Sequence, residues 1–469
     1  LFGHQVRAFH DPGAPIGDPA ALKAVGALGR RAAAESLGTD PGPVHINLPL
    51  REPLVPTSAG EPGEAAPSDR PEAEPRERQA ALGFVPPITL PLDLRERLVG
   101  RGLIYCGPDA PRPGFPEALW RCAAALGLPV LADPLSEVRF GPGPALIGTG
   151  IGTGTGAIRI ARYKCIVRNP KAAQALKPDW VLRFGRAPIS RTVLEWLEGV
   201  PTLLVDPARR WADPSHELAQ PRSLHLAADP RALCEALAAD PPRPADPAWC
   251  DLWRRAEGRA AALAQIYLDE APWCEAQVIL DLLDRLPPGD GLLCGNSLPI
   301  RQMETWAGSR EAPLRLFGNR GASGIDGQLS TLAGLNAAGI PTTGLLGDLS
   351  FLHDLSGLLL GGRLDRPCVV LNNGGGRIFD YLPQAGLPDF ERLWRTPRPL
   401  DLGALAGVFG LRHRRVCEAA AWGEALGDEL RRCRCGESGG LIEVAVDAES
   451  SQEVHLGFRR RLADADLLD

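Results

Sequence analysis

Two short polar motifs near the C-terminal end of the chain each follow a hydrophobic run. The motif GDL at 347–349 follows TTGLLG, and the motif NNGG at 372–375 follows CVVL. Both runs have the length and apolar content of buried parallel strands, and the segment between them is long enough for one crossover helix. Because the carboxyl ends of neighbouring parallel strands meet at one edge of a sheet, we expect Asp348 and Asn373 to emerge close together.

These residues are suited to hold a divalent cation against a phosphate group. Mg²⁺ prefers oxygen ligands, and Mn²⁺ accepts the same donors, so the Asp348 carboxylate, the Asn373 amide oxygen and the Gly375 carbonyl could share the ion with phosphate oxygens. The glycines allow the backbone to approach the phosphates closely. Asp348 alone could equally cap the following helix. Its combination with Asn373 and the glycines favours a magnesium-diphosphate site.

Four longer motifs occur in a fixed order around this pair. They are GNSLPIR at 295–301, GNRGASGIDG at 318–327, GDLSFLHDL at 347–355 and NNGGGRIF at 372–379. In this order they resemble the thiamine-diphosphate enzyme superfamily, and within it the MenD family of 2-succinyl-5-enolpyruvyl-6-hydroxy-3-cyclohexene-1-carboxylate synthases. The segment VHINLPLREPL at 44–54 resembles the same family, so the similarity spans nearly the whole chain.

The resemblance implies an enzyme, a thiamine-diphosphate-dependent transferase that joins two substrates. Such an enzyme decarboxylates 2-oxoglutarate and adds the resulting succinyl-semialdehyde carbanion to isochorismate, which is a step of menaquinone biosynthesis. The implied cofactors are thiamine diphosphate and Mg²⁺, with Mn²⁺ as a substitute. The implied assembly is a homodimer or a homotetramer.

The resemblance also assigns site residues. Arg301 and Arg320 match positions that bind substrate carboxylates, which arginine can hold with two parallel hydrogen bonds, although on composition alone each would be a solvated surface charge. Arg191 matches a basic position where the family more often has lysine. Ile325 matches the residue that supports the bent cofactor, although an isoleucine is ordinarily part of a core. The other cofactor positions are Gly324, Gly347, Leu349 and Ser350, and the other substrate positions are Ser297, Ile378, Phe379 and Leu382, the last three of which could equally be core.

The family activates its cofactor with a glutamate that contacts the pyrimidine ring. The resemblance puts that glutamate upstream of Leu1, so we assign no catalytic residue and expect residues 1–469 alone to be inactive. Two alternatives stay open. One is another thiamine-diphosphate 2-oxo-acid decarboxylase or carboligase, of the acetolactate-synthase type, which Arg301 and Arg320 disfavour because they suit a dicarboxylate better than pyruvate. The other is a noncatalytic cofactor-binding fragment.

The composition argues against several other classes of protein. The formal net charge of −6 gives no electrostatic case for binding nucleic acid. No apolar run approaches the ~20 residues of a membrane span, and no signal peptide opens the sequence, so we expect a cytoplasmic location. The 11 cysteines include no CxxC pair, and we expect core thiols rather than a zinc site.

The pattern of elements predicts an α/β protein with doubly wound parallel-sheet domains of the thiamine-diphosphate-enzyme type, the first of which is incomplete. Residues 1–54 contain one amphipathic helix, at about 19–38, and one strand, at 44–48. Two elements cannot bury a sheet of their own. This part is therefore expected to be the remnant of a pyrimidine-binding domain.

The rest of the chain divides by composition. A Pro-rich linker at 55–92 leads to a central α/β domain at 93–240, and a diphosphate-binding domain occupies 250–469. The glycine-rich stretch at 148–156 lacks the GxGxxG spacing of a nucleotide-binding loop. We therefore expect it to be a flexible insertion.

Overall fold

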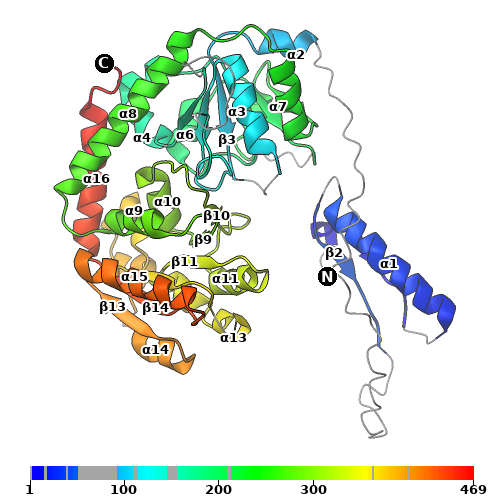
Figure 1. The fold of residues 1–469 in the computed structure, drawn as a ribbon, viewed down its shortest axis with the longest axis vertical. Coiled ribbons are helices and arrows are strands. Elements are labelled where there is room, and N and C mark those ends of the chain that lie inside the picture. The colour runs from blue at the N-terminus through cyan, green and yellow to red at the C-terminus, as the bar shows by residue number, and fades with distance from the viewer. Residues whose placement is uncertain are drawn as a thin grey trace, which may run out of the picture.

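Two six-stranded sheets form the body of the protein, one built from the central part of the chain and one from the C-terminal part (Figure 1). The computed structural model describes residues 3–14, 18–38, 41–50, 92–108, 113–144, 156–208, 213–361, 364–398 and 401–469. The expected Pro-rich linker lies outside the described residues except for Leu92, and so does 148–155 of the glycine-rich stretch.

The C-terminal sheet has the strand order β10-β9-β11-β12-β14-β13, and each neighbouring pair is parallel. Adjacent residues of its strands face opposite cores: Leu292 contributes to one core and Leu293 to the other. Because both faces are covered, the inner strands are nearly continuous apolar runs. The strands are β9 (Gly291–Cys294), β10 (Arg315–Phe317), β11 (Thr342–Gly347), β12 (Cys368–Asn372), β13 (His413–Val416) and β14 (Leu441–Ala445).

Helices cover both faces of this sheet. Side chains of α9, α10 and α15 form the core on one face, and side chains of α11, α12 and α14 form the core on the other. The prediction of a doubly wound parallel sheet is therefore confirmed. The helices and helical turns of this part are α9 (Glu275–Arg285), α10 (Leu298–Trp306), α11 (Gln328–Ala337), α12 (Asp348–His353), α13 (Gly357–Gly361), η3 (Arg377–Tyr381), η4 (Pro383–Gly386), η5 (Glu391–Arg395), α14 (Leu402–Val408) and α15 (Ala419–Arg434).

The prediction of one crossover helix between β11 and β12 is wrong, because α12 and α13 are separate helices. Between them, Asp354 accepts hydrogen bonds from the backbone nitrogen of Ser330 at 2.7 Å and from the Ser330 hydroxyl at 3.0 Å. These bonds hold the turn against α11. The two helices are therefore separated at the residue that bonds to the start of α11.

The central sheet has the order β5-β4-β3-β6-β7-β8 and is also parallel. Its strands are β3 (Gly102–Cys106), β4 (Pro129–Ala132), β5 (Ile158–Ile160), β6 (Trp180–Phe184), β7 (Thr202–Val205) and β8 (Leu224–Leu226). Helices α2, α3 and α7 pack on one face, and α4, α5, α6 and the first half of α8 pack on the other. Their bounds, with one helical turn, are α2 (Leu92–Arg97), α3 (Phe115–Leu126), α4 (Tyr163–Ile166), α5 (Pro170–Ala175), α6 (Arg191–Leu197), η2 (Glu217–Ala219), α7 (Pro230–Ala239) and α8 (Pro247–Asp269).

Two long helices, α8 and α16 (Ala448–Asp464), run side by side along both sheets (Figure 1). Trp253 in the first half of α8 belongs to a core of the central sheet, whereas Leu268 near its end packs in a cluster with Trp306 of α10. Phe458 of α16 stacks on Trp306 with ring centroids 4.4 Å apart. Beyond α16, Leu467 enters the same core of the central sheet as Trp253. The two sheets are therefore joined by helices that are buried against both.

The N-terminal segment forms a small unit of its own. It contains η1 (Gly3–Gln5), β1 (Ala8–His10), α1 (Pro19–Leu37) and β2 (Val44–Ile46). The expected helix and strand are present, but the expectation of a single strand is wrong, because β1 pairs with β2 in parallel. Phe9 of β1 is 57% exposed, which shows how little apolar surface a two-stranded sheet can bury.

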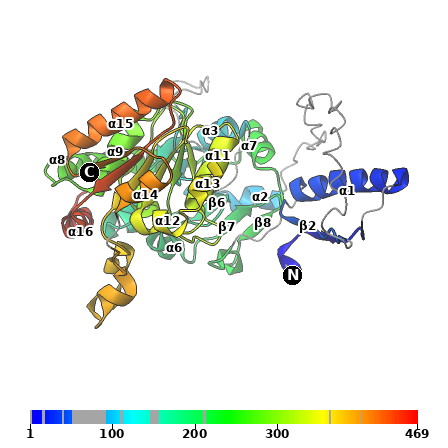
Figure 2. The same cartoon turned by 90° about the horizontal axis from the view of Figure 1, so that it is seen from below.

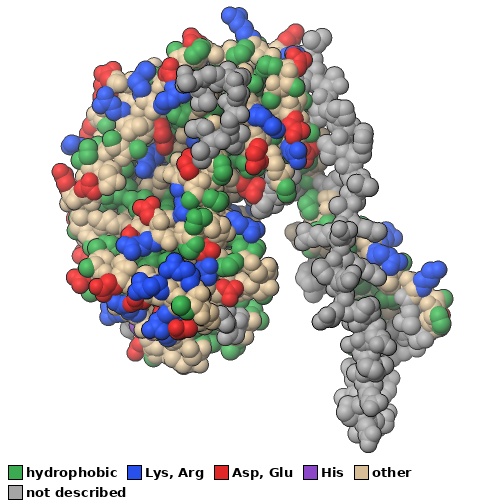
Figure 3. Space-filling model, viewed as in Figure 1, with side chains coloured by type: hydrophobic (Ala, Val, Ile, Leu, Met, Phe, Trp, Pro, Cys, Tyr) green, Lys and Arg blue, Asp and Glu red, His purple; other side chains and the backbone are tan. Residues whose placement is uncertain are grey.

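The surface mixes charges of both signs. Lys and Arg side chains gather over α15 and β13 on the face shown in Figure 3. The arginines there are matched by acidic groups: Arg412 pairs with Glu429 at 2.8 Å, and Arg414 pairs with Asp428 at 2.9 Å. None of the helices in the described ranges is long and apolar enough to cross a membrane. Of the cysteines, all but Cys417 and Cys435 are buried.

Candidate functional site

The structure brings Asp348 and Asn373 to neighbouring strand ends. β11 and β12 run in parallel with Gly347 in register with Leu371, so the residues that follow each strand emerge at the same sheet edge. Asp348 is only 4% exposed. Its Oδ1 accepts a hydrogen bond from the backbone nitrogen of Leu349, and its Oδ2 accepts one from that of Gly375, both at 2.8 Å. Burial raises the pKa of the Asp348 carboxyl, and these backbone N–H groups oppose the shift.

Glycine is required in the turn that carries the Gly375 carbonyl. Gly375 has φ +120°, and a Cβ added there would lie 2.4 Å from the carbonyl oxygen of Arg395. The next residue, Gly376, donates its N–H to that same oxygen at 2.7 Å. The turn therefore lies directly against the backbone of Arg395, and a side chain at position 375 would move the turn away from Asp348.

Glu275, at the start of α9, is a part of this site that sequence reasoning missed. Its Oε1 accepts a hydrogen bond from Nδ2 of Asn373 at 2.6 Å, and its Oε2 accepts one from Nε2 of Gln302. The side chain is buried, with 2% exposed. Burial raises the pKa of Glu275, and the charge of Asp348 raises it further, while the bonds from Asn373 and Gln302 oppose the shift. In the sequence Glu275 looks like an acidic residue in the first turn of a helix, which is common.

The donors at this edge fit a magnesium ion bound to a diphosphate. They are a carboxylate, an amide oxygen and a backbone carbonyl, all of them hard oxygen ligands. No group of three or more His, Cys, Asp or Glu side chains that could hold a metal ion occurs among the described residues. A cation at Asp348 would therefore need further oxygen ligands from outside the protein, as Mg²⁺ with phosphate has.

The loop after β10 is fastened to the neighbouring strand end by Asn296, which is fully buried. Nδ2 of Asn296 donates to the carbonyl oxygen of Gly324 at 2.6 Å and to that of Asn319 at 2.8 Å. Gln328 donates to the same Gly324 oxygen at 3.1 Å. Ile325, next in the chain, is half-buried. These bonds fix Gly324 and Ile325 at the sheet edge that also carries Asp348.

Arg301 and Arg320 lie close to one another on this edge. Nη1 of Arg320 donates to Oδ1 of Asn296, and Nη1 of Arg301 donates to the carbonyl oxygen of Ser297, both at 2.8 Å. Burial lowers the pKa of both guanidinium groups, and the charge of Arg320 lowers that of Arg301 further. Two cations held together in this way favour an anionic ligand between them.

Ser297 adopts an unusual backbone conformation between β9 and α10. Its φ is +74° with ψ −128°, a region that residues with a Cβ rarely occupy. Such strain is concentrated at functional sites, where the surrounding structure enforces it. Here the conformation is accompanied by the bond from Arg301 to the Ser297 carbonyl.

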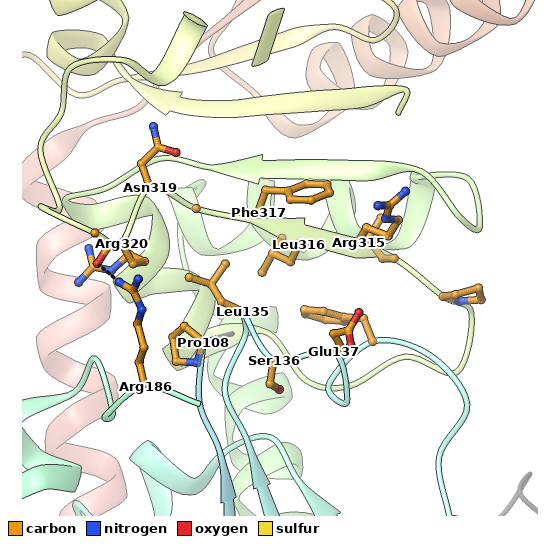
Figure 4. Close-up of a pocket in the computed structure, with 15 residues that line it drawn as sticks. Pro108, Leu135, Ser136, Glu137, Arg186, Arg315, Leu316, Phe317, Asn319 and Arg320 are labelled. Atoms are coloured by element: carbon orange, nitrogen blue, oxygen red, sulfur yellow. Dashed lines mark hydrogen bonds between the residues drawn. The ribbon is translucent and has the colours of Figure 1, made fainter. Parts of the chain in front are cut away.

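A cavity of about 520 Å³ opens beside Arg320. Its walls come from β10 and from strand-end loops of both sheets, and they include Pro108, Leu135, Arg186, Asn319 and Arg320 (Figure 4). Arg186, which follows β6, points across the cavity toward Arg320 and donates from Nη1 to the Arg320 carbonyl oxygen at 3.1 Å (Figure 4). A second cavity of about 430 Å³ shares Arg186 and Arg320. Volumes of this size suit small organic ligands.

Asp348 and Asn373 do not line these cavities. They belong to the same edge, however, because the strand order is β10-β9-β11-β12. Parallel strands are about 4.8 Å apart, so the strand ends that carry the arginines lie roughly 10–15 Å from the end of β12.

The structure does not bring Arg191 to the cavities. Its side chain is 89% exposed and pairs with Glu195, one turn along α6, at 2.8 Å. The predicted apolar wall lies just after the metal turn, where Ile378 and Phe379 are half-buried and Leu382 is 42% exposed. Phe379 packs edge-on against Trp394 with centroids 5.3 Å apart.

Curated relatives of the chain carry the name of one family. No protein-family model matches the chain. It is similar to 2-succinyl-5-enolpyruvyl-6-hydroxy-3-cyclohexene-1-carboxylate synthases from Geobacillus kaustophilus (35% identical; 97% of this chain and 76% of the relative are covered), Dechloromonas aromatica (37%; 88% and 71%) and Haloarcula marismortui (34%; 99% and 78%).

A solved structure supports the fold. The chain superposes on a candidate thiamin diphosphate-dependent enzyme from Mycobacterium smegmatis with a TM-score of 0.52 at 18% identity, covering 94% of this chain and 76% of that one. The matches to the curated relatives cover most of both sequences. The chain therefore belongs to the 2-succinyl-5-enolpyruvyl-6-hydroxy-3-cyclohexene-1-carboxylate synthase family of thiamine-diphosphate enzymes.

Proposed function

We propose that the chain is a thiamine-diphosphate-dependent transferase that makes 2-succinyl-5-enolpyruvyl-6-hydroxy-3-cyclohexene-1-carboxylate from 2-oxoglutarate and isochorismate in menaquinone biosynthesis. The observation that carries the proposal is the shared sheet edge. It holds the buried Asp348 beside the half-buried Asn373, and two half-buried cations, Arg301 and Arg320, in a chain of this family. An enzyme that handles a diphosphate cofactor and two carboxylated substrates needs both pairs.

In this proposal the residues of the metal turn hold Mg²⁺, or Mn²⁺ in its place. Asp348, Asn373 and the Gly375 carbonyl are the protein ligands, and the diphosphate supplies others. Ile325 supports the middle of the cofactor, and the remaining contacts come from Gly324, Gly347, Leu349 and Ser350. When bound, thiamine diphosphate supplies the electron sink for loss of CO₂ and formation of the new carbon–carbon bond.

The arginines hold and orient the substrate carboxylates in this proposal, with Ser297 beside them. Ile378, Phe379 and Leu382 exclude water from the reacting end of the cofactor. For the cation from the central sheet, the geometry favours Arg186 over Arg191, since Arg186 reaches toward Arg320 across the cavity while Arg191 is exposed and paired with Glu195.

We also propose a homodimer or homotetramer. The segment 377–395 projects from the body as a golden coil in Figure 2 and carries exposed apolar side chains: Leu382 is 42% exposed, Leu387 53% and Leu393 57%. Apolar side chains grouped on a projecting segment are typical of a surface that another subunit covers.

The test is a substrate comparison. The full-length protein, rather than residues 1–469 alone, is given Mg²⁺, thiamine diphosphate and 2-oxoglutarate or pyruvate labelled at the carboxyl group next to the oxo group. Labelled CO₂ is measured with and without isochorismate, and the coupled product is measured by mass spectrometry. CO₂ from 2-oxoglutarate and the coupled product are expected. CO₂ from pyruvate alone would support the acetolactate-synthase-type alternative. Cofactor binding without CO₂ from either acid would support a noncatalytic protein.

A further inference from the structure

We propose that Glu275 is a positioning residue for the metal site, which holds the Asn373 amide with its oxygen turned toward the cation. The two residues are 98 positions apart in the chain and meet because α9 begins beside the end of β12. The bond from Asn373 Nδ2 to Glu275 Oε1 measures 2.6 Å, and the Glu275 side chain is 2% exposed. Water therefore cannot replace this contact without a rearrangement of the site.

The orientation of the amide follows from the chemistry of its partner. An asparagine side chain ends in an NH₂ group, which donates, and an oxygen, which accepts. Which of the two faces a given neighbour is decided by the hydrogen bonds that they make. Both oxygens of Glu275 receive an N–H group, one from Asn373 and one from Gln302. A carboxylate can only accept hydrogen bonds, so it must face the NH₂ group of Asn373. The amide oxygen, Oδ1, then points away from Glu275. Without Glu275 the amide could turn and present its NH₂ group to the cation.

The same bond also strengthens the ligand. A carboxylate that accepts from an amide N–H polarises the amide and increases the negative charge on its oxygen. Outer-shell partners of this kind typically change metal affinity by 10- to 100-fold when they are removed. We therefore expect Glu275 to act on the affinity for Mg²⁺ rather than on the fold alone.

The chain contains a matched control in the preceding residue. Asn372 donates from Nδ2 to Oε1 of Glu443 at 2.8 Å, and Glu443 is 4% exposed. Both contacts join an asparagine at the end of β12 to a buried glutamate. Asn372 is not in the proposed metal site, so loss of the Glu443 contact tests what a buried glutamate contributes to the fold near this edge.

The experiment uses metal-stripped protein with thiamine diphosphate, titrated with Mg²⁺ and followed by calorimetry, and with thermal unfolding measured in the absence of metal. Glu275→Gln is expected to raise the Kd for Mg²⁺ by about 10- to 100-fold, because glutamine can donate to the amide oxygen and turn it from the cation. Glu443→Gln is expected to leave this Kd unchanged. Equal losses of Mg²⁺ affinity in the two variants would overturn the inference.

A double variant tests the orientation itself. In Glu275→Gln/Asn373→Asp, the introduced glutamine donates to one oxygen of the introduced aspartate, and the other oxygen faces the cation, so most of the lost Mg²⁺ affinity should return. This variant also keeps the test open if the single variant does not fold. A double variant that folds but binds Mg²⁺ no better than Glu275→Gln would contradict the inference.

The inference rests on the proposed function, and Asp348→Ala separates the two. If Asp348→Ala retains Mg²⁺-dependent cofactor binding, the proposed metal site is wrong. If Asp348→Ala loses that binding while Glu275→Gln keeps the wild-type Kd, the metal site stands and the role of Glu275 is refuted.

Discussion

A buried carboxyl group at the edge of the central sheet should make stability fall as the pH rises. Asp133 follows β4 and is fully buried. Its Oδ1 accepts from the backbone nitrogen of Leu135 at 2.9 Å, and its Oδ2 accepts from the hydroxyls of Tyr105 and Tyr163 at 3.2 and 3.4 Å. Burial raises the pKa of Asp133 from 3.8 to about 7, and the charge of Glu304 adds to the shift.

The sign follows from linkage. Because the folded-state pKa is raised, folding favours the protonated carboxyl, and this contribution is complete below pH 3.8 and is lost as the pH rises through about 7. At 1.36 kcal/mol per pKa unit, the whole shift corresponds to about 4 kcal/mol, of which about 2 kcal/mol is lost between pH 5.5 and 8. Asp133→Asn keeps an acceptor for the Leu135 nitrogen and cannot ionise, so this variant should lose that part of the pH dependence.

The assay is hydrogen exchange of the β4 amides in increasing urea at pH 5.5 and 8, which reports the free energy of unfolding of the unit that contains Asp133. Glu117→Gln, which changes an exposed carboxylate on α3, is the control and should keep the wild-type pH dependence. If Asp133→Asn and the wild type lose the same free energy between the two pH values, the Asp133 carboxyl is ionised throughout and the reasoning is refuted.

Three further predictions concern the site in the full-length protein. Asp348→Ala should abolish Mg²⁺-dependent binding of thiamine diphosphate in calorimetry, and unchanged affinity would rule out the metal assignment. Arg301→Lys and Arg320→Lys keep the charge but lose the bidentate contact with a carboxylate. Transition-state stabilisation should fall by about 1.5–3 kcal/mol, which lowers kcat/KM for 2-oxoglutarate by a factor of ten to more than a hundred. Wild-type values of kcat/KM in both variants would show that these residues do not hold its carboxylates. Arg186→Ala should raise KM for a carboxylated substrate while Arg191→Ala should not, and the reverse result would restore Arg191 to the site.

The sequence predicts the inner strands well for a physical reason. Strands buried on both faces, such as β11 and β12, must be apolar at nearly every position, so their runs stand out. The edge strands do not meet this condition. β13 reads HRRV, and both of its arginines, Arg414 and Arg415, form ion pairs, so nothing in its pattern distinguishes it from a loop. An edge strand of this kind forms because its backbone pairs with a neighbouring strand, as β13 does with β14, and not because of its own apolar pattern.

The site, too, has residues that the sequence predicts and residues that it does not. Asp348, Asn373 and the arginines lie within motifs whose order along the chain indicates their roles. Glu275 belongs to no such motif, and its contact with Asn373 exists only once α9 has packed beside β12. Arg191 illustrates the converse: its place in a motif suggested a role, but the turn of helix on which it lies pairs it with Glu195 instead. Side-chain direction is decided by packing, which a motif does not contain.

The helices that cross both sheets limit how substrates can be selected. α8 and α16 are buried against both layers, and Asn169 of the central part donates to the carbonyl oxygens of Leu462 at 2.9 Å and Ala465 at 2.7 Å at the end of α16. A hinge that widened the space between the sheets would have to tear these contacts apart. These contacts therefore oppose a hinge motion that would change the distance between the two sheets. With that distance held, the choice between acids of different length would depend on the side chains that line the cavity between the sheets, and substitution of single loop residues would change specificity without a change in the fold.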